Sequence, residues 1–88
     1  MIELDIINPS DNLRAFITGV WPEDEFLYVY DEGEHYYIKC DQCTFWDGNY
    51  TITLNYENRA IIRLSLYKGE FEQVRNITKN KGGKYNDH

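Results

Sequence analysis

The sequence contains few of the residues that enzymes use for catalysis. Its only imidazoles are His35 and His88, and its only serines are Ser10 and Ser65, with no nucleophile motif around them. Cys40 and His35 could in principle act as thiolate and base, but residues five apart on one strand point to opposite faces. We therefore expect a protein that is not an enzyme and has no catalytic residues.

Cysteine is also scarce, because Cys40 and Cys43 form a single C-x-x-C pair. A structural zinc ion needs four ligands, and His35 and His88 are the only other soft ligands, so a dimer mate would have to complete the site. A redox dithiol typically lies at a helix N-terminus, whereas the residues around this pair are typical of strands. We interpret the pair as structural thiols and expect no cofactor, with zinc binding through Cys40 and Cys43 as an alternative.

Long apolar runs are absent, which excludes a membrane-spanning helix. A chain of 88 residues is too short to divide into two units with separate cores. We expect one domain over residues 1–77 and a disordered basic tail over 78–88, since residues 79–84 include no apolar side chain. The first five residues lack the basic segment and apolar stretch of a secretory signal, so a cytoplasmic location is expected.

Basic residues are scarce in the first part of the chain. Residues 1–35 hold nine acidic residues and one basic residue, Arg14, whereas residues 59–88 hold seven basic and three acidic residues. The formal net charge is -6. A protein of this charge mostly repels a polyanion, which argues against nucleic acid as the partner.

The hydrophobic pattern changes period along the chain. Alternation over residues 2–6 predicts a strand. Apolar residues spaced i, i+3, i+4 and i+7 from Leu13 to Val20 predict a short helix, with Asn8 as its capping residue and Pro9 at its first position. Residues 26–67 then resemble strands joined by short turns, among them a tight Asp47-Gly48 turn with positive φ angles. Residues 70–78 fit either a brief helix or a strand.

These patterns predict an α+β domain. One short N-terminal helix packs on a four- to six-stranded antiparallel meander sheet, because such short connections permit only antiparallel neighbours. A small all-β barrel is the alternative fold.

Aromatic residues are abundant, since they make up 16% of the chain and eight of them are tyrosines. A core this small cannot hide them all with their hydroxyl groups satisfied, so some must face solvent or a partner. Aromatic side chains ringed by carboxylates suit a basic patch on another protein. The predicted partner-binding residues are Glu23, Asp24, Glu25, Tyr28, Tyr30, Asp31, Glu32, Glu34, Tyr37, Trp46 and Tyr67.

The expected function is that of a small acidic binding protein, a monomer or homodimer, which inhibits a basic, nucleic-acid-handling partner protein by occlusion. In size and composition the chain resembles immunity proteins and phage-encoded inhibitors of host defence or DNA enzymes, a resemblance that implies no individual functional residue. The alternative is a nucleic-acid or nucleotide-binding module. In that module the sheet aromatics would stack on bases while Lys79, Lys81 and Lys84 of the tail contact phosphates.

Overall fold

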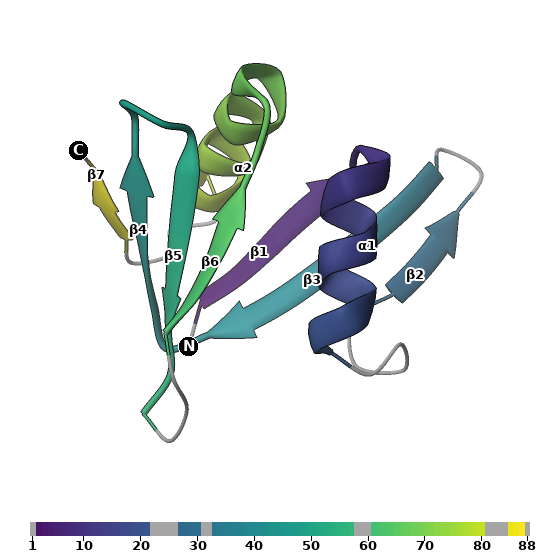
Figure 1. The fold of residues 1–88 in the computed structure, drawn as a ribbon, viewed down its shortest axis with the longest axis horizontal. Coiled ribbons are helices and arrows are strands. Elements are labelled where there is room, and N and C mark those ends of the chain that lie inside the picture. Colours follow the sequence, from purple (N-terminus) through teal and green to yellow (C-terminus); the bar gives the residue numbers. More distant parts are fainter. Residues whose placement is uncertain (1, 22–26, 31–32, 58–60, 81–84, 88) are drawn as a thin grey trace.

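A computed structural model describes residues 2–21, 27–30, 33–57, 61–80 and 85–87, with the backbone alone for 27–30, 79–80 and 85–87. The described residues form strands and two helices (Figure 1). In chain order these elements are β1 (Ile2–Ile7), α1 (Asp11–Val20), β2 (Leu27–Tyr30), β3 (Gly33–Cys40), β4 (Gln42–Trp46), β5 (Thr51–Asn55), β6 (Ile62–Ser65), α2 (Lys68–Asn80) and β7 (Tyr85–Asp87).

The strands are divided between two sheets. The first sheet has the order β1-β3-β2 and the second has the order β6-β5-β4-β7. All pairs are antiparallel except β4 and β7, which are parallel. The predicted α+β class and the antiparallel pairing are confirmed, but the prediction of a single meander sheet with one helix is wrong. The described strands do not close into a barrel either.

The chain passes from the first sheet to the second at Asp41, the one residue between β3 and β4. Its backbone N–H donates to the carbonyl of Asn55 at 3.0 Å, and its carboxylate accepts from the N–H of Glu57 at 2.7 Å. Cys40 and Cys43 are both buried in the core, although residues three apart on a straight strand point to opposite faces. The chain around Asp41 contains no glycine or proline, so the sequence gives no sign that β3 ends and β4 begins there in a different sheet.

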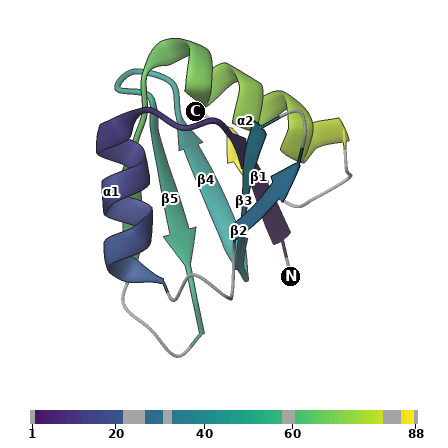
Figure 2. The same ribbon diagram turned by 90° about the vertical axis from the view of Figure 1, so that its right-hand side faces the viewer.

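The inner faces of both sheets share one core with the helices. In Figure 2, α1 lies along one side of the molecule and α2 crosses its top, with strands of both sheets between them. Helix α2 packs against β1, and its Phe71 ring meets the rings of Phe45 and Tyr50 edge-on, each with centroids 5.7 Å apart. The largest fully buried side chains are Tyr36, Phe45, Phe71, Leu4, Ile6, Ile17, Ile38, Ile52, Leu54, Leu64 and Val74.

Helix α1 begins later than the sequence pattern suggests. Its N-cap is Ser10, whose hydroxyl accepts from the N–H of Leu13, and Pro9 precedes the helix. Leu13 and Ile17 are buried, but the predicted apolar stripe is narrower than expected because Phe16 and Val20 are 43% and 41% exposed. The helix therefore contributes two buried positions of the four expected.

Helix α2 continues past residue 77, where we expected the domain to end. Residues 70–78 are helical, and Thr78 is fully buried with its hydroxyl donating to the carbonyl of Val74 at 2.7 Å. The backbone of residues 85–87 pairs with Cys43–Phe45 of β4. The rest of the predicted tail, residues 81–84 and 88, lies outside the described residues.

A single carboxylate joins the starts of the two helices. One oxygen of Glu70 accepts from the backbone N–H of Ser10 at 2.7 Å, and the other accepts from the N–H of Tyr67 at 3.0 Å. Both N–H groups belong to helix N-termini, which lack partners within their own helices. The negative charge is also favourable at this end of a helix dipole.

The turn between β4 and β5 differs from the predicted tight turn. Four residues, 47–50, connect the strands, and the positive φ angle of 50° falls on Tyr50 rather than on Gly48. The half-buried Tyr50 ring packs against Phe71, which places a tyrosine at a position that more often holds glycine or asparagine. The Asp-Gly sequence thus predicts the position of the turn correctly, but the predicted two-residue type with positive φ angles at Asp47 and Gly48 is wrong.

Candidate binding surface

The predicted partner-binding residues fall on several parts of the chain. Tyr28 and Tyr30 belong to β2, where they pair with His35 and Gly33 of β3, and their side chains are outside the description. The predicted acids of residues 23–32 lie outside the described residues, namely Glu23, Asp24, Glu25, Asp31 and Glu32. The predicted residues with described side chains are Glu34, Tyr37, Trp46 and Tyr67.

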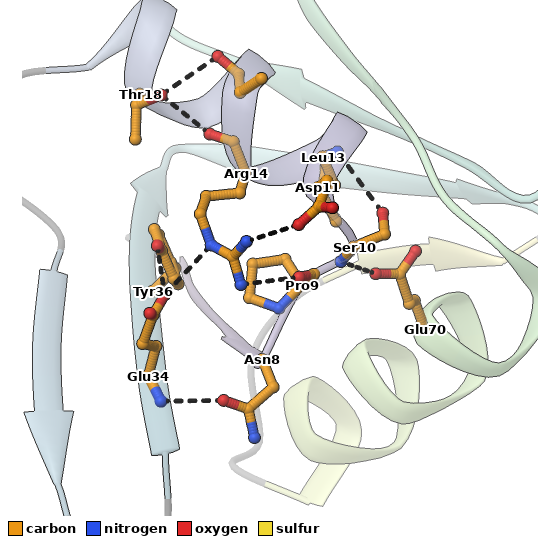
Figure 3. A network of polar contacts seen from close by, with 11 residues as sticks. Asn8, Pro9, Ser10, Asp11, Leu13, Arg14, Thr18, Glu34, Tyr36 and Glu70 are labelled. Atoms are coloured by element: carbon orange, nitrogen blue, oxygen red, sulfur yellow. Dashed lines mark hydrogen bonds and ion pairs between the residues drawn. The ribbon is translucent and has the colours of Figure 1, made fainter.

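Glu34 is engaged within the molecule (Figure 3). Its Oε2 accepts a hydrogen bond from the hydroxyl of Tyr36 at 2.6 Å and from Nε of Arg14 at 3.1 Å. The Tyr36 hydroxyl, and then the charge of Arg14, hold the pKa of Glu34 below its usual value. Arg14 also pairs with Asp11 at 2.9 Å. The Glu34 carboxylate therefore joins β3 to α1 through Arg14 and is used within the molecule.

Tyr37 belongs to a polar cluster on the outer face of the first sheet. Its ring stacks on the His35 ring with centroids 5.8 Å apart, and Nδ1 of His35 lies 3.2 Å from Oδ1 of Asp5. Asp5 is buried and His35 and Tyr37 are half-buried. Cys40 points instead into the core, so His35 and Cys40 do not form the thiolate and base pair considered above.

Trp46 and Tyr67 are exposed, and they lie on different parts of the second half of the chain. Tyr67, 63% exposed, stands in the link between β6 and α2. Trp46, 41% exposed, ends β4. The four described residues therefore do not gather on one surface, and Trp46 alone of them lines a hollow.

This hollow lies on the outer face of β4, β5 and β6 and has a volume of about 570 Å³. Opposite residues of neighbouring strands share a face, and the register aligns two rows across the hollow. One row is Trp46, Thr51 and Ser65, and the central row is Thr44, Thr53 and Arg63. The lining is completed by Asn49, Asn55 and Ile61.

The indole of Trp46 is held over the central row. Its Nε1–H donates to Oγ1 of Thr53 at 2.8 Å. Thr53 pairs with Thr44, so the indole reaches diagonally from its own row toward the middle of the hollow. With the N–H used in this bond, the group that Trp46 offers to a ligand is the apolar surface of its ring.

The hollow differs in charge from the acidic chain around it. None of its described lining residues is acidic, and Arg63 supplies a positive charge. Arg14 pairs with Asp11 and Glu34, and Arg75 pairs with Asp47 at 2.6 Å. Arg63, by contrast, forms no ion pair with any residue of the described ranges. The central row of the hollow therefore contains an arginine that has no ion-pair partner in the part of the chain that the structure describes.

Cys40 and Cys43 are reduced thiols, and both are buried beside Asp41. A hydrogen bond between them lowers the pKa of Cys40 and raises the pKa of Cys43. Within the described ranges, no cluster of three or more His, Cys, Asp or Glu side chains could hold a metal ion. Zinc binding through Cys40 and Cys43 stays a prediction that would need further ligands.

Trp46 is one of the binding residues predicted from the sequence, but none of the residues that line the hollow with it is among them. The alternation of Thr51, Thr53 and Asn55 with buried Ile52 and Leu54 signals one polar, outward face of a strand. That signal does not reveal which neighbouring strands extend the face. Arg63 joins it only because β6 pairs with β5 in the observed register.

Neither described helix has the length and apolar character needed to cross a membrane. Comparison of the chain with protein-family models, with curated proteins and with solved structures finds no match.

Proposed function

We propose that this chain is a non-enzymatic binding protein that docks onto another protein through the outer face of β4, β5 and β6 and inhibits it by occlusion. The observation that carries the proposal is the pair of exposed apolar side chains in the hollow, Trp46 and Ile61. They are 41% and 60% exposed; Trp46 ends β4, Ile61 directly precedes β6, and both line the hollow. Exposed tryptophan and arginine on a well-supported surface are the residue types that dominate binding energy at protein interfaces.

The inner side of the same strands explains why the face is suited to docking. Phe45, Ile52 and Leu64 alternate with the lining residues and are fully buried, so they fix the backbone from which the hollow is built. A surface that is ordered before binding loses little conformational entropy when a partner arrives. The hydroxyl and amide groups around Trp46 and Ile61 form a polar rim of the kind found at protein interfaces.

The prediction that the partner is basic stays a prediction. Of the six acidic residues behind it, five lie outside the described residues and Glu34 is bound to Arg14 and Tyr36. Its own test is charge reversal at residues 23–25, which should slow association with a basic partner and reduce the salt dependence of that rate.

Affinity capture from a lysate of the source organism tests the docking face. The baits are the wild type, the double variant W46A/I61S and the control variant F16A, which removes an equally exposed aromatic from α1. We expect a protein that is retained by the wild type and by F16A and lost from W46A/I61S. Retention by all three baits would place the interface elsewhere on the molecule.

A further inference from the structure

We infer that the hollow on β4, β5 and β6 recognises a protein segment that presents a carboxylate to Arg63 beside an apolar group on Trp46. This inference rests on the proposed function and names the chemistry of the partner at that face. It follows from the charges, hydrogen bonds and register of the described lining residues.

The first step is charge complementarity. The chain carries 15 acidic residues against 9 basic ones, yet none of the described lining residues of the hollow is acidic. The other two described arginines with ion pairs lie outside the hollow, where Arg75 pairs with Asp47 and Arg14 pairs with Glu34. Arg63 has no such partner in the described ranges, so the hollow has a positive charge for an incoming carboxylate to neutralise.

The second step is the set of donors around Arg63. A guanidinium group binds a carboxylate through two parallel N–H donors, which gives both strength and orientation. Thr53 lies opposite Arg63 in the register and Thr44 lies opposite Thr53, so hydroxyl groups extend from Arg63 across the central row. These groups can donate to backbone carbonyls of the segment or to the second carboxylate oxygen.

The third step is the distance between the two anchors. Trp46 is on β4 and Arg63 is on β6, so their backbones are separated by two strand spacings, about 10 Å, across the sheet. Trp46 is level with Ser65, so Arg63 is also offset by two residues, about 7 Å, along the strand. The bond to Thr53 brings the indole toward Arg63 and narrows this separation. A segment with an acidic residue and an apolar residue a few positions apart can reach both anchors.

A net basic partner does not conflict with this inference. The site requires one carboxylate at one place, and a protein that is basic overall can present it. Aromatic stacking and a single cation could also serve single-stranded nucleic acid, but the net charge of -6 opposes a polyanion, and one arginine gives little counterion release. A protein segment is therefore the occupant that the charges favour.

The test is selection of random displayed peptides on four immobilised proteins: the wild type, R63E, the matched control K39E and W46A. Lys39 is an exposed cation on β3 of the other sheet, so K39E changes the net charge equally without touching the hollow. On the wild type and K39E we expect enriched peptides with Asp or Glu near an apolar residue. On R63E the acidic preference should disappear or change to Lys or Arg, and a selected peptide should bind R63E about tenfold more weakly or worse.

Each outcome has a separate meaning. Peptides that depend on Trp46 but show no acidic preference overturn this inference and leave the proposed function standing. Absence of any enrichment that depends on Trp46 overturns both. Binding of a thymidine oligonucleotide that is lost in R63E, without peptide enrichment, makes nucleic acid the occupant and also overturns it. If R63E does not unfold cooperatively like the wild type, R63Q replaces it, with loss of the acidic preference expected.

Discussion

The polar side chains on the outer face of the first sheet contact one another, whereas Arg63 on the outer face of the second sheet has no ion pair among the described residues. On the first sheet, Asp5 lies beside His35, His35 stacks on Tyr37, and at the edge Glu34 holds Arg14. On the second sheet, Arg63 has no ion pair in the described ranges, and Trp46 and Ile61 are exposed beside it. Polar groups that satisfy one another stabilise the fold, whereas groups left without partners are available to another molecule. The first face therefore serves the fold, and the second is the candidate for function.

The strongest test of this contrast is removal of the Asp5 carboxylate. Asp5→Ala removes the carboxylate that lies 3.2 Å from Nδ1 of the half-buried His35, and we expect a loss of about 1–3 kcal/mol in the free energy of unfolding. Asp5→Asn keeps a hydrogen-bond acceptor and should lose less. Denaturant unfolding of both variants measures the difference. Equal stability of Asp5→Ala and the wild type would show that the first face does not serve the fold in this way.

A smaller effect is expected at Glu34, and it depends on pH. Because the folded pKa of Glu34 lies below the usual value of 4.5, ionised Glu34 adds stability that is fully present above pH 4.5. That stability is lost as the pH falls through the lowered folded pKa. Glu34→Gln should therefore unfold more easily than the wild type at neutral pH, and the two thermal midpoints should converge in acid. If the difference between the two thermal midpoints is the same at neutral and acidic pH, the ionised Glu34 carboxylate does not stabilise the first face.

The smallest effect on stability is expected on the second face. Trp46→Ala removes an exposed side chain and one exposed hydrogen bond, so the free energy of unfolding should change by no more than about 0.5 kcal/mol. Partner binding should be lost in the same variant. Thermal unfolding and the capture experiment, performed on one preparation, separate the two quantities. A large loss of stability would show that Trp46 serves the fold as well.

The sequence predicts those parts of the fold whose signals are local. The alternation in β1, the helix α1 and the antiparallel pairing of the successive strands β2 and β3 are each specified within about fifteen residues, and all three are observed. The division into two sheets depends on Asp41, where an ordinary polar residue turns the chain because Asn55 and Glu57 bind it. Such contacts between distant residues leave no periodic signal.

The candidate site was predictable to the same limited degree. An exposed tryptophan and an outward row of threonines can be expected from composition and alternation. Their meeting with Arg63 depends on the register between β5 and β6, which the inner apolar residues set. The acidic residues that dominated the sequence-based prediction either lie outside the described residues or, as with Glu34, bind within the molecule.

The double hydrogen bond of Glu70 has a consequence for the order in which the molecule completes itself during synthesis. The amide that opens the first helix receives its partner from a residue 60 positions further along the chain. A ribosome adds that residue 60 positions after Ser10, so until then the amide of Ser10 has water rather than Glu70 as its partner. The start of the first helix therefore reaches its final hydrogen bonding only after the start of the second helix has been synthesised.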